Sequence, residues 1–227
     1  MASLFAAQAA LILEDHGQFE NLERLRDQSL TALVRAIETK DLYTHRHSER
    51  TRALVRAMSQ EIPLPESLIL QIERGAVLHD IGKIGIEDAI LKKTGPLTPE
   101  EYTVMKTHPA LGLQILQPVR FLRAASAIVL YHQEWFNGAG YPEGLAGEEI
   151  PLGARIVQII DAWDAMTSDR PYRKAMPKSA AITELRRQAG TQFDPKLVDI
   201  FLRVIDRLER EGVPTTEIPR QTASLPS

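Results

Sequence analysis

Cysteine is missing from this 227-residue chain. Its absence excludes a disulfide framework and metal sites built from thiolates, so any metal must be held by histidine and carboxylate side chains. Long hydrophobic runs are missing too. The apolar stretch 2–13 is too short to span a bilayer, has no Lys or Arg before it, and is followed by acidic residues. We therefore expect a cytoplasmic protein without direct membrane insertion.

Positive charge is not in excess either. The chain has 27 Lys and Arg against 30 Asp and Glu, which gives a net charge of -3 with histidine neutral. Without a net basic character, binding to a nucleic acid polymer is not expected. A phosphate-bearing ligand would need local positive charge instead, which Lys83, Arg170 and Arg173 could provide.

Strand signals are almost absent, because apolar residues recur mainly at helical spacing and no Asn-Gly or Asp-Gly pair joins two alternating segments. The sequence therefore predicts an all-α fold. One helix is expected within 18–39 and another over 179–188. Two N-cap patterns, Thr98-Pro99-Glu100-Glu101 and Asp194-Pro195, predict two further helix starts.

Three segments are expected along the chain. Residues 1–29 are interpreted as an N-terminal helical segment, either a linker or a dimerisation helix, with a plain surface helix as the alternative. Residues 30–212 are expected to form the main domain, which is long enough for one well-packed core. Residues 213–227 are rich in Pro, Thr and Ser and are predicted to form a flexible tail. The long connection 136–153 favours a functional loop over a purely structural one.

The most informative stretch is His79-Asp80-Ile81-Gly82-Lys83, which places an imidazole, a carboxylate and an ammonium group close together. It follows a largely apolar helical segment, 68–78, so the polar pair is expected near the end of a buried helix. An unpaired charge would be costly there. The pair is therefore either a hydrogen-bonded helix cap or a pair of metal ligands, and the doublet alone does not separate these two interpretations.

Other candidate ligands are few, because the chain has only six histidines. His47, His108 and His132 lie at expected element boundaries, where side chains from different elements can converge. Asp161 follows an apolar run and is expected to be buried. Mixed imidazole and carboxylate ligation suits Mn, Fe, Co, Ni or Zn better than Ca or Mg, and Asp80 could bridge two ions through its two oxygens.

Taken in order, these residues resemble the HD-GYP family, a group of HD-domain metal-dependent phosphohydrolases associated with hydrolysis of the bacterial second messenger cyclic di-GMP. The resemblance runs from about residue 30 to residue 208. A lone His-Asp pair is a weak signal, whereas the whole ordered series is specific. The matching segments are 36–41, 47–50, 79–86, 108–109, 132–142, 148–151, 161–173 and 190–195.

The resemblance implies an HD-domain helical bundle with an N-terminal helical extension. It also implies a binuclear centre of two divalent transition metal ions, with Fe or Mn expected first and Ni, Co or Zn as alternatives. The implied metal ligands are His47, His79, Asp80, His108, His132 and Asp161.

The same resemblance assigns further roles in the site. Asp80 and Lys83 would be catalytic, with Asp80 between the ions and Lys83 beside the phosphate or the bridging hydroxide. The implied substrate-binding residues are Gly140, Tyr141 and Pro142 in the pocket wall, and Arg170 and Arg173 on the nucleotide.

The implied activity is hydrolysis of cyclic di-GMP by a metal-bridging hydroxide to linear pGpG, with GMP as a further product. Family members often carry a second His where this chain has Gln133, which predicts a weaker second metal site because an amide oxygen is a poorer ligand than imidazole. They also often have Asp where this chain has Asn137. These two departures keep open an alternative, a catalytically weakened member that serves as a cyclic dinucleotide receptor or a protein-interaction module. Expected partners are an upstream sensor module or signalling protein, and a second copy in a homodimer formed through the N-terminal helix.

Overall fold

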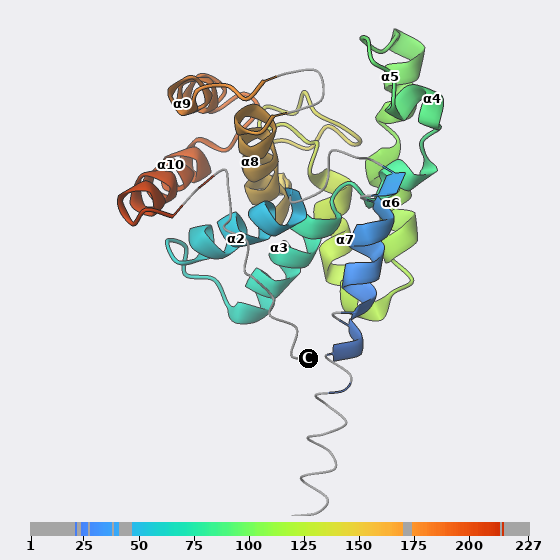
Figure 1. The fold of residues 1–227 in the computed structure, drawn as a ribbon, viewed down its shortest axis with the longest axis horizontal. Helices are drawn as coiled ribbons and strands as arrows, with labels where there is room; N and C mark the ends of the chain where they lie inside the picture. The colour runs from blue at the N-terminus through green and yellow to red at the C-terminus, as the bar shows by residue number, and fades with distance from the viewer. Residues whose placement is uncertain are drawn as a thin grey trace, which may run out of the picture.

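The computed structural model of the chain describes residues 21, 24–26, 28–37, 39–40, 47–169, 174–213 and 215. Within these residues the regular structure is helical, with two isolated β-bridges and no strand (Figure 1). The prediction of an all-α fold is confirmed. After a helical segment that includes residues 28–37, the elements are α2 (His47–Ser59), α3 (Glu66–Leu78), η2 (Ile81–Gly85), α4 (Asp88–Leu91), α5 (Pro99–Met105), α6 (His108–Leu116), η3 (Arg120–Leu122), α7 (Arg123–Tyr131), η4 (Gly147–Glu149), α8 (Leu152–Thr167), α9 (Lys178–Arg187) and α10 (Pro195–Arg210).

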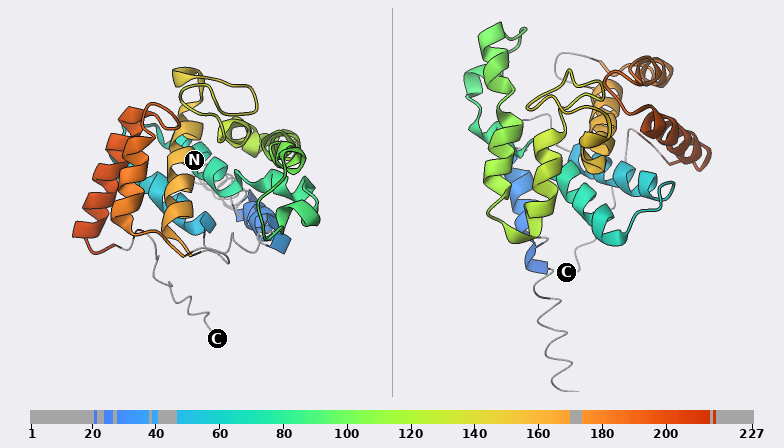
Figure 2. Two further views of the ribbon diagram at one scale, coloured as in Figure 1. Left: turned by 90° about the horizontal axis from the view of Figure 1, so that it is seen from above. Right: turned by 180° about the vertical axis from the view of Figure 1, so that it is seen from behind.

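The larger of two hydrophobic cores surrounds α8, against which α2, α3, α9 and α10 pack (Figures 1 and 2). Trp163 of α8 and Phe201 of α10 are fully buried there and meet edge to face, with 5.6 Å between their ring centroids. The helix α8 is apolar around most of its circumference, as expected for a helix at the centre of a bundle. It provides the rigid element on which Asp161 is carried.

A second, smaller core joins the N-terminal helical segment to the elements that follow α3. Ile37 is 3% exposed and packs in a cluster with Leu78, Ile81 and Val129. At the end of this segment, Lys40 donates a hydrogen bond to the carbonyl oxygen of Ile84, at 3.0 Å. Residues 21, 24–26, 28–37 and 39 of the predicted 18–39 helix are helical, and the remainder lies outside the described residues.

The short helices α4 and α5 form an arm that projects from the body of the molecule (Figures 1 and 2). Neither helix has a buried residue. The capping box predicted for α5 is present: Glu101 N donates to Thr98 Oγ1 at 3.2 Å, and Thr98 N donates to Glu101 Oε2 at 2.7 Å. The second predicted cap is also present, because Asp194 accepts a hydrogen bond from Lys196 N at 2.9 Å at the start of α10.

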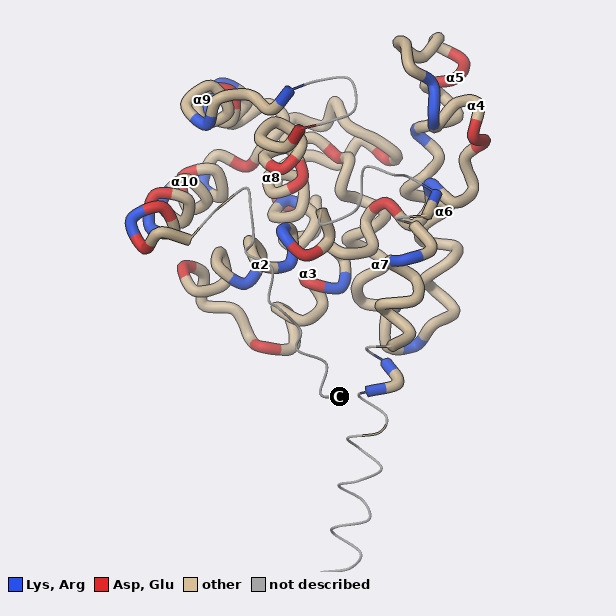
Figure 3. Tube along the Cα trace, viewed as in Figure 1, with Lys and Arg blue, Asp and Glu red and all other residues tan. Residues whose placement is uncertain are grey.

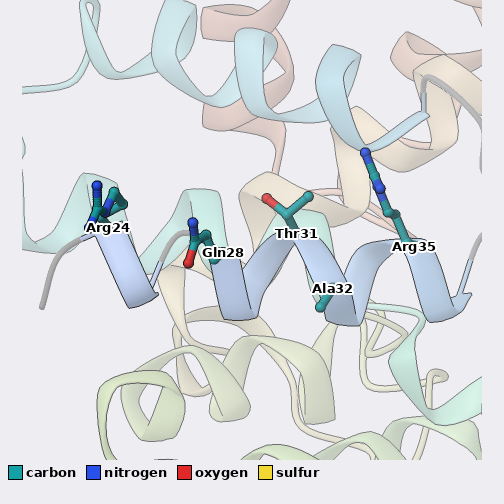
Figure 4. Close-up of a pocket in the computed structure, with 5 residues that line it drawn as sticks. All are labelled: Arg24, Gln28, Thr31, Ala32 and Arg35. Atoms are coloured by element: carbon teal, nitrogen blue, oxygen red, sulfur yellow. The ribbon is translucent and has the colours of Figure 1, made fainter. Parts of the chain in front are cut away.

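The surface has mixed charge, and Lys or Arg alternate with Asp or Glu along α10 (Figure 3). One pocket lies along the N-terminal helical segment and contains none of the predicted site residues; it is lined by Arg24, Gln28, Thr31, Ala32 and Arg35 (Figure 4). No described helix is long and apolar enough to cross a membrane. Beyond α10, Thr215 is 5% exposed, and the remainder of the predicted tail, except Val213, lies outside the described residues.

Candidate metal centre

The predicted ligands come together from five parts of the bundle. His47 is the first residue of α2, and His79 and Asp80 lie between α3 and η2. His108 begins α6, and His132 directly follows α7. The sixth ligand, Asp161, lies within α8 rather than at an element boundary.

One group of ligands consists of His47, His79 and Asp161, each of which offers one ligand atom within 4.8 Å of the others. Asp161 Oδ1 lies 3.6 Å from His47 Nε2 and 3.7 Å from His79 Nε2. Asp161 is 29% exposed at its side chain, which is more than the sequence led us to expect. The two imidazoles are buried beneath it, so the carboxylate is the part of this group that faces solvent.

The second group surrounds Asp80, and its compact members are His79, Asp80 and His132. Asp80 Oδ2 is 3.4 Å from His79 Nε2, whereas Asp80 Oδ1 is 3.4 Å from His108 Nε2 and 4.0 Å from His132 Nε2. The two oxygens of one carboxylate therefore face different imidazoles. This is the arrangement that a carboxylate needs in order to serve two ions at once.

The four imidazoles are oriented by hydrogen bonds at the nitrogen that faces away from the site. Nδ1 of His79, His108 and His132 lies 2.7, 2.9 and 2.7 Å from the carbonyl oxygens of Ala76, Met105 and Val129, respectively. A carbonyl can only accept, so each Nδ1 is protonated and donates, which leaves each Nε2 as the nitrogen that faces the site. His47 obtains the same orientation from a side chain, because its Nδ1 lies 2.7 Å from Asp164 Oδ2.

The donor set fits a transition metal ion. His79 Nε2 is buried and has no hydrogen-bond partner within the described part of the chain, and a buried polar atom of this kind is costly unless something binds it. His108 Nε2 and His132 Nε2 lie only 3.2 Å apart. Converging imidazole nitrogens with fixed ring orientations and nearby carboxylates are the ligands that Mn, Fe, Co, Ni and Zn prefer.

Electrostatics divide the site into cationic and neutral parts. Burial lowers the pKa of His79 most strongly, yet the neighbouring Asp80 and Asp161 outweigh it and raise that pKa to about 9. Burial, with the nearby His79, lowers the pKa of His132 well below its usual value, and burial also lowers the pKa of His108. Metal binding at His79 would therefore displace a proton, whereas His108 and His132 are neutral and ready to bind.

Lys83 lies beside the doublet, as the sequence suggested. Its Nζ is 2.8 Å from Asp80 Oδ2. Burial acts to raise the pKa of Asp80, but the charges of Lys83 and His79 hold it well below the usual range. Gly82 allows this close packing, because a Cβ at that position would lie 1.8 Å from the carbonyl oxygen of His108.

The Gly140-Tyr141-Pro142 loop lies next to this centre. A Cβ on Gly140 would lie 2.2 Å from the backbone nitrogen of Trp135, so only glycine fits there. Tyr141 is half-buried, and its ring centroid is 6.4 Å from that of His108. Pro142 follows through a cis peptide bond and is exposed. Through its ring, Tyr141 therefore borders the predicted ligand His108.

The departures from the family pattern fall in this loop or just before it. Gln133 is half-buried, and its backbone carbonyl oxygen accepts a hydrogen bond from Tyr141 N at 3.2 Å. Asn137 is exposed, and its Oδ1 accepts from Ala139 N at 3.0 Å, so it stabilises a turn. The predicted nucleotide-binding Arg170 and Arg173 lie outside the described residues.

Two further residues of the site were not found from the sequence. Glu134 is 1% exposed, and its Oε1 accepts hydrogen bonds from Glu143 N and Gly144 N at 2.7 and 3.0 Å, which holds the loop. Asp164 accepts from His47 and Arg50; burial would raise its pKa, but these hydrogen bonds lower it to about 2. The available signals were the positions of Glu134 just after His132 and of Asp164 one helical turn after Asp161.

Comparison with known proteins places this chain in a family. A family profile described as HD domain matches residues 31–197. The chain belongs to the HD domain family. Together with the cyclic di-GMP phosphodiesterases among its relatives, this match confirms the prediction of an HD-GYP protein. All six of the predicted ligands fall within the matched range.

Several curated relatives of the HD domain are phosphodiesterases by name. The cyclic di-GMP phosphodiesterase response regulator RpfG of Xanthomonas campestris is 41% identical over 207 residues, which cover 89% of this chain and 55% of RpfG. A cyclic di-GMP phosphodiesterase of Thermotoga maritima is 39% identical over 188 residues, covering 82% of this chain and 51% of the relative. The 3'3'-cGAMP-specific phosphodiesterase 3 of Vibrio cholerae is 32% identical, covering 85% of this chain and 41% of the relative. The chain thus spans about half the length of these relatives.

Solved structures show the same fold. The cyclic GMP-AMP specific phosphodiesterase V-cGAP3 of V. cholerae aligns with a TM-score of 0.65 at 21% identity, covering 87% of this chain and 53% of that one. The HD domain of the Listeria monocytogenes phosphodiesterase PgpH, solved with cyclic-di-AMP, aligns with a TM-score of 0.55 at 16% identity, covering 80% of this chain and 97% of that one. These likenesses confirm the HD-domain helical bundle.

Proposed function

We propose that this HD domain is a metal-dependent phosphodiesterase that hydrolyses cyclic di-GMP to linear pGpG, with GMP as a further product. The observation that carries the proposal is the position of Asp80, whose two oxygens face different imidazoles of one histidine cluster. The names of the curated relatives support the substrate class.

The proposed centre holds two divalent transition metal ions, with Fe or Mn expected first and Ni, Co or Zn as alternatives. Bound ions of this kind activate water and stabilise negative charge on phosphoryl oxygens. The proposed ligands are His47, His79, Asp80, His108, His132 and Asp161, with Asp80 shared.

Side chains around the proposed ligands would stabilise charge on the phosphate and bind the nucleotide. Lys83 Nζ, held 2.8 Å from Asp80 Oδ2, supplies a positive charge beside the proposed centre. Such a charge stabilises the developing negative charge of phosphoryl transfer. Tyr141 and the loop around it limit the space beside His108, and we propose that Arg170 and Arg173 hold the nucleotide.

The proposal is tested by incubating Mn- or Fe-loaded protein with cyclic di-GMP and separating the products by chromatography. We expect pGpG from the wild-type protein and none from Asp80→Asn, because an amide offers only one ligand oxygen and cannot contact both ions. Asp88→Asn is the matched control, since Asp88 is an exposed acid paired with Lys40 and Lys92. A parallel reaction with 3'3'-cGAMP tests the substrate named for other relatives.

Metal content separates catalysis from the alternative of a receptor. Two ions per chain with no cleavage of either dinucleotide would contradict the enzymatic proposal and favour a receptor. Gln133 remains the reason to measure both ions, because its position predicts a weaker second site. The homodimer, the upstream sensor and the cytoplasmic location stay predictions.

A further inference from the structure

Asp164 is a buried carboxylate to which the sequence analysis assigned no role. It is 2% exposed and lies on α8, one helical turn after the ligand Asp161. Its Oδ2 is 2.7 Å from His47 Nδ1 and 2.9 Å from Arg50 Nη2, while its Oδ1 accepts from Arg50 Nε and, at 3.3 Å, from Ser168 Oγ. A bidentate arginine contact keeps a carboxylate ionised and fixed in orientation.

The orientation of His47 differs in one respect from that of the other three imidazoles. Those rings are held by backbone carbonyl oxygens three residues earlier in the chain, which no substitution of a side chain removes. His47 is the one predicted ligand whose Nδ1 is held by another side chain. Its tautomer therefore depends on a residue that can be replaced.

The pairing also sets the position of α2 against α8. His47 and Arg50 lie three residues apart on α2, and Asp161 and Asp164 lie three residues apart on α8, so each pair shares one face of its helix. Asp164 contacts both residues of the α2 pair, which brings His47 Nε2 to 3.6 Å from Asp161 Oδ1. The four residues thus form one unit, in which two supply ligand atoms and two position them.

We propose that Asp164 is the positioning residue that keeps His47 in its Nδ1-protonated tautomer and so directs the lone pair of Nε2 to the metal centre. An ionised carboxylate can only accept a hydrogen bond, which requires the proton on Nδ1. An asparagine side chain can keep its oxygen on Arg50 and turn its NH2 group to His47. That group donates, and it favours the tautomer of His47 with the proton on Nε2. In this tautomer Nε2 has no lone pair to offer to the metal centre. This inference rests on the proposed metal centre and does not depend on the substrate.

The predicted effect is selective. Only the group His47, His79 and Asp161 contains His47, whereas the group around Asp80 and His132 does not. Loss of a residue that orients a metal-bound histidine typically weakens metal affinity about 10- to 100-fold. Asp164→Asn should weaken one ion by that factor and leave the other unchanged.

The matched control is Ser168→Ala. This substitution removes a hydrogen bond to the same carboxylate but leaves the contacts of Asp164 with His47 and Arg50 in place. It should bind both ions as the wild type does. A loss of affinity equal to that of Asp164→Asn would mean that general loosening around Asp164 explains the effect, and would overturn the proposal.

The direct test is nitrogen-15 NMR of the histidine side chains in metal-free protein, combined with Mn2+ titration by calorimetry. The wild type should show His47 protonated at Nδ1, and Asp164→Asn should shift only His47 to the Nε2-protonated form. Wild-type His47 protonated at Nε2 overturns the proposal, and this measurement needs no folded variant. An unchanged His47 tautomer in Asp164→Asn, or unchanged affinity for both ions, overturns it as well. Failure of the wild type to cleave cyclic di-GMP would instead contradict the proposed function and leave the tautomer result standing.

Discussion

Gly82 is the point at which a single added methyl group should displace a predicted ligand. A Cβ there would lie 1.8 Å from the carbonyl oxygen of His108 and 2.6 Å from the backbone nitrogen of Gly112, both in α6. Both clashing atoms are backbone, so no side-chain rotation relieves the contact. In Gly82→Ala, α6 must therefore move away from η2 by about 1 Å to restore van der Waals contact.

This displacement is large compared with what a metal site tolerates. Ligand distances in such sites hold to about 0.2 Å, and His108 Nε2 already lies 3.4 Å from Asp80 Oδ1. We expect Gly82→Ala to lose the ion near His108 and to lower phosphodiesterase activity about 100-fold. Overpacking of this kind costs about 3 kcal/mol, which lowers the melting temperature of a protein of this size by roughly 6–12 °C.

Thermal melts, elemental analysis and the hydrolysis assay measure these three effects. The matched control is Gly95→Ala, because a Cβ on Gly95 would meet no atom within 4 Å. This control should keep its metal and its activity and gain up to about 1 kcal/mol from the stiffer unfolded chain. If Gly82→Ala matched Gly95→Ala in melting temperature and metal content, the packing of α6 on η2 described above would be wrong.

Three other predictions concern parts of the bundle at different distances from the site. Asp194→Ala removes the cap of α10 and leaves Arg155 without the carboxylate that it contacts at 2.7 Å, and urea unfolding should show a loss of about 3 kcal/mol. Thr98→Ala removes only the cap of the exposed α5 and should cost about 1 kcal/mol, with metal content unchanged by elemental analysis. Chelation of bound metal should lower the melting temperature in a thermal scan, because an ion held by buried imidazoles stabilises the folded state alone. An unchanged melting temperature would contradict a metal site held between α2, α6 and α8.

The helical fold could be predicted because it is encoded locally. Apolar spacing and cap patterns such as Thr98 to Glu101 act within one or two turns, and the structure contains both predicted caps. The role of the His79-Asp80 doublet could not be decided from these two residues alone. A helix cap and a pair of metal ligands can both be built from a His and an Asp at the end of a helix. In the structure His79 Nδ1 donates to Ala76 O, while Nε2 faces the other predicted ligands, so the two interpretations are compatible.

The residues that orient the ligands were harder to predict, because their partners are distant in sequence. Arg50 and Asp164 are 114 positions apart and meet only when α2 packs on α8. Glu134 is adjacent in sequence to a predicted weak point, Gln133, yet its function is to accept hydrogen bonds from the backbone of a loop nine and ten residues later. The exposure of Asp161 was also misjudged, because an apolar run before an acid does not show which face of the helix the acid occupies.

The most direct test is anomalous X-ray diffraction at the metal absorption edge from crystals of Mn- or Fe-loaded protein. We predict two peaks, one among His47, His79 and Asp161 and the other beside His108 and His132, with Asp80 contacting both. Two peaks joined by Asp80 would establish the binuclear centre. No peak among these six residues, or one peak that Asp80 does not contact, would contradict it.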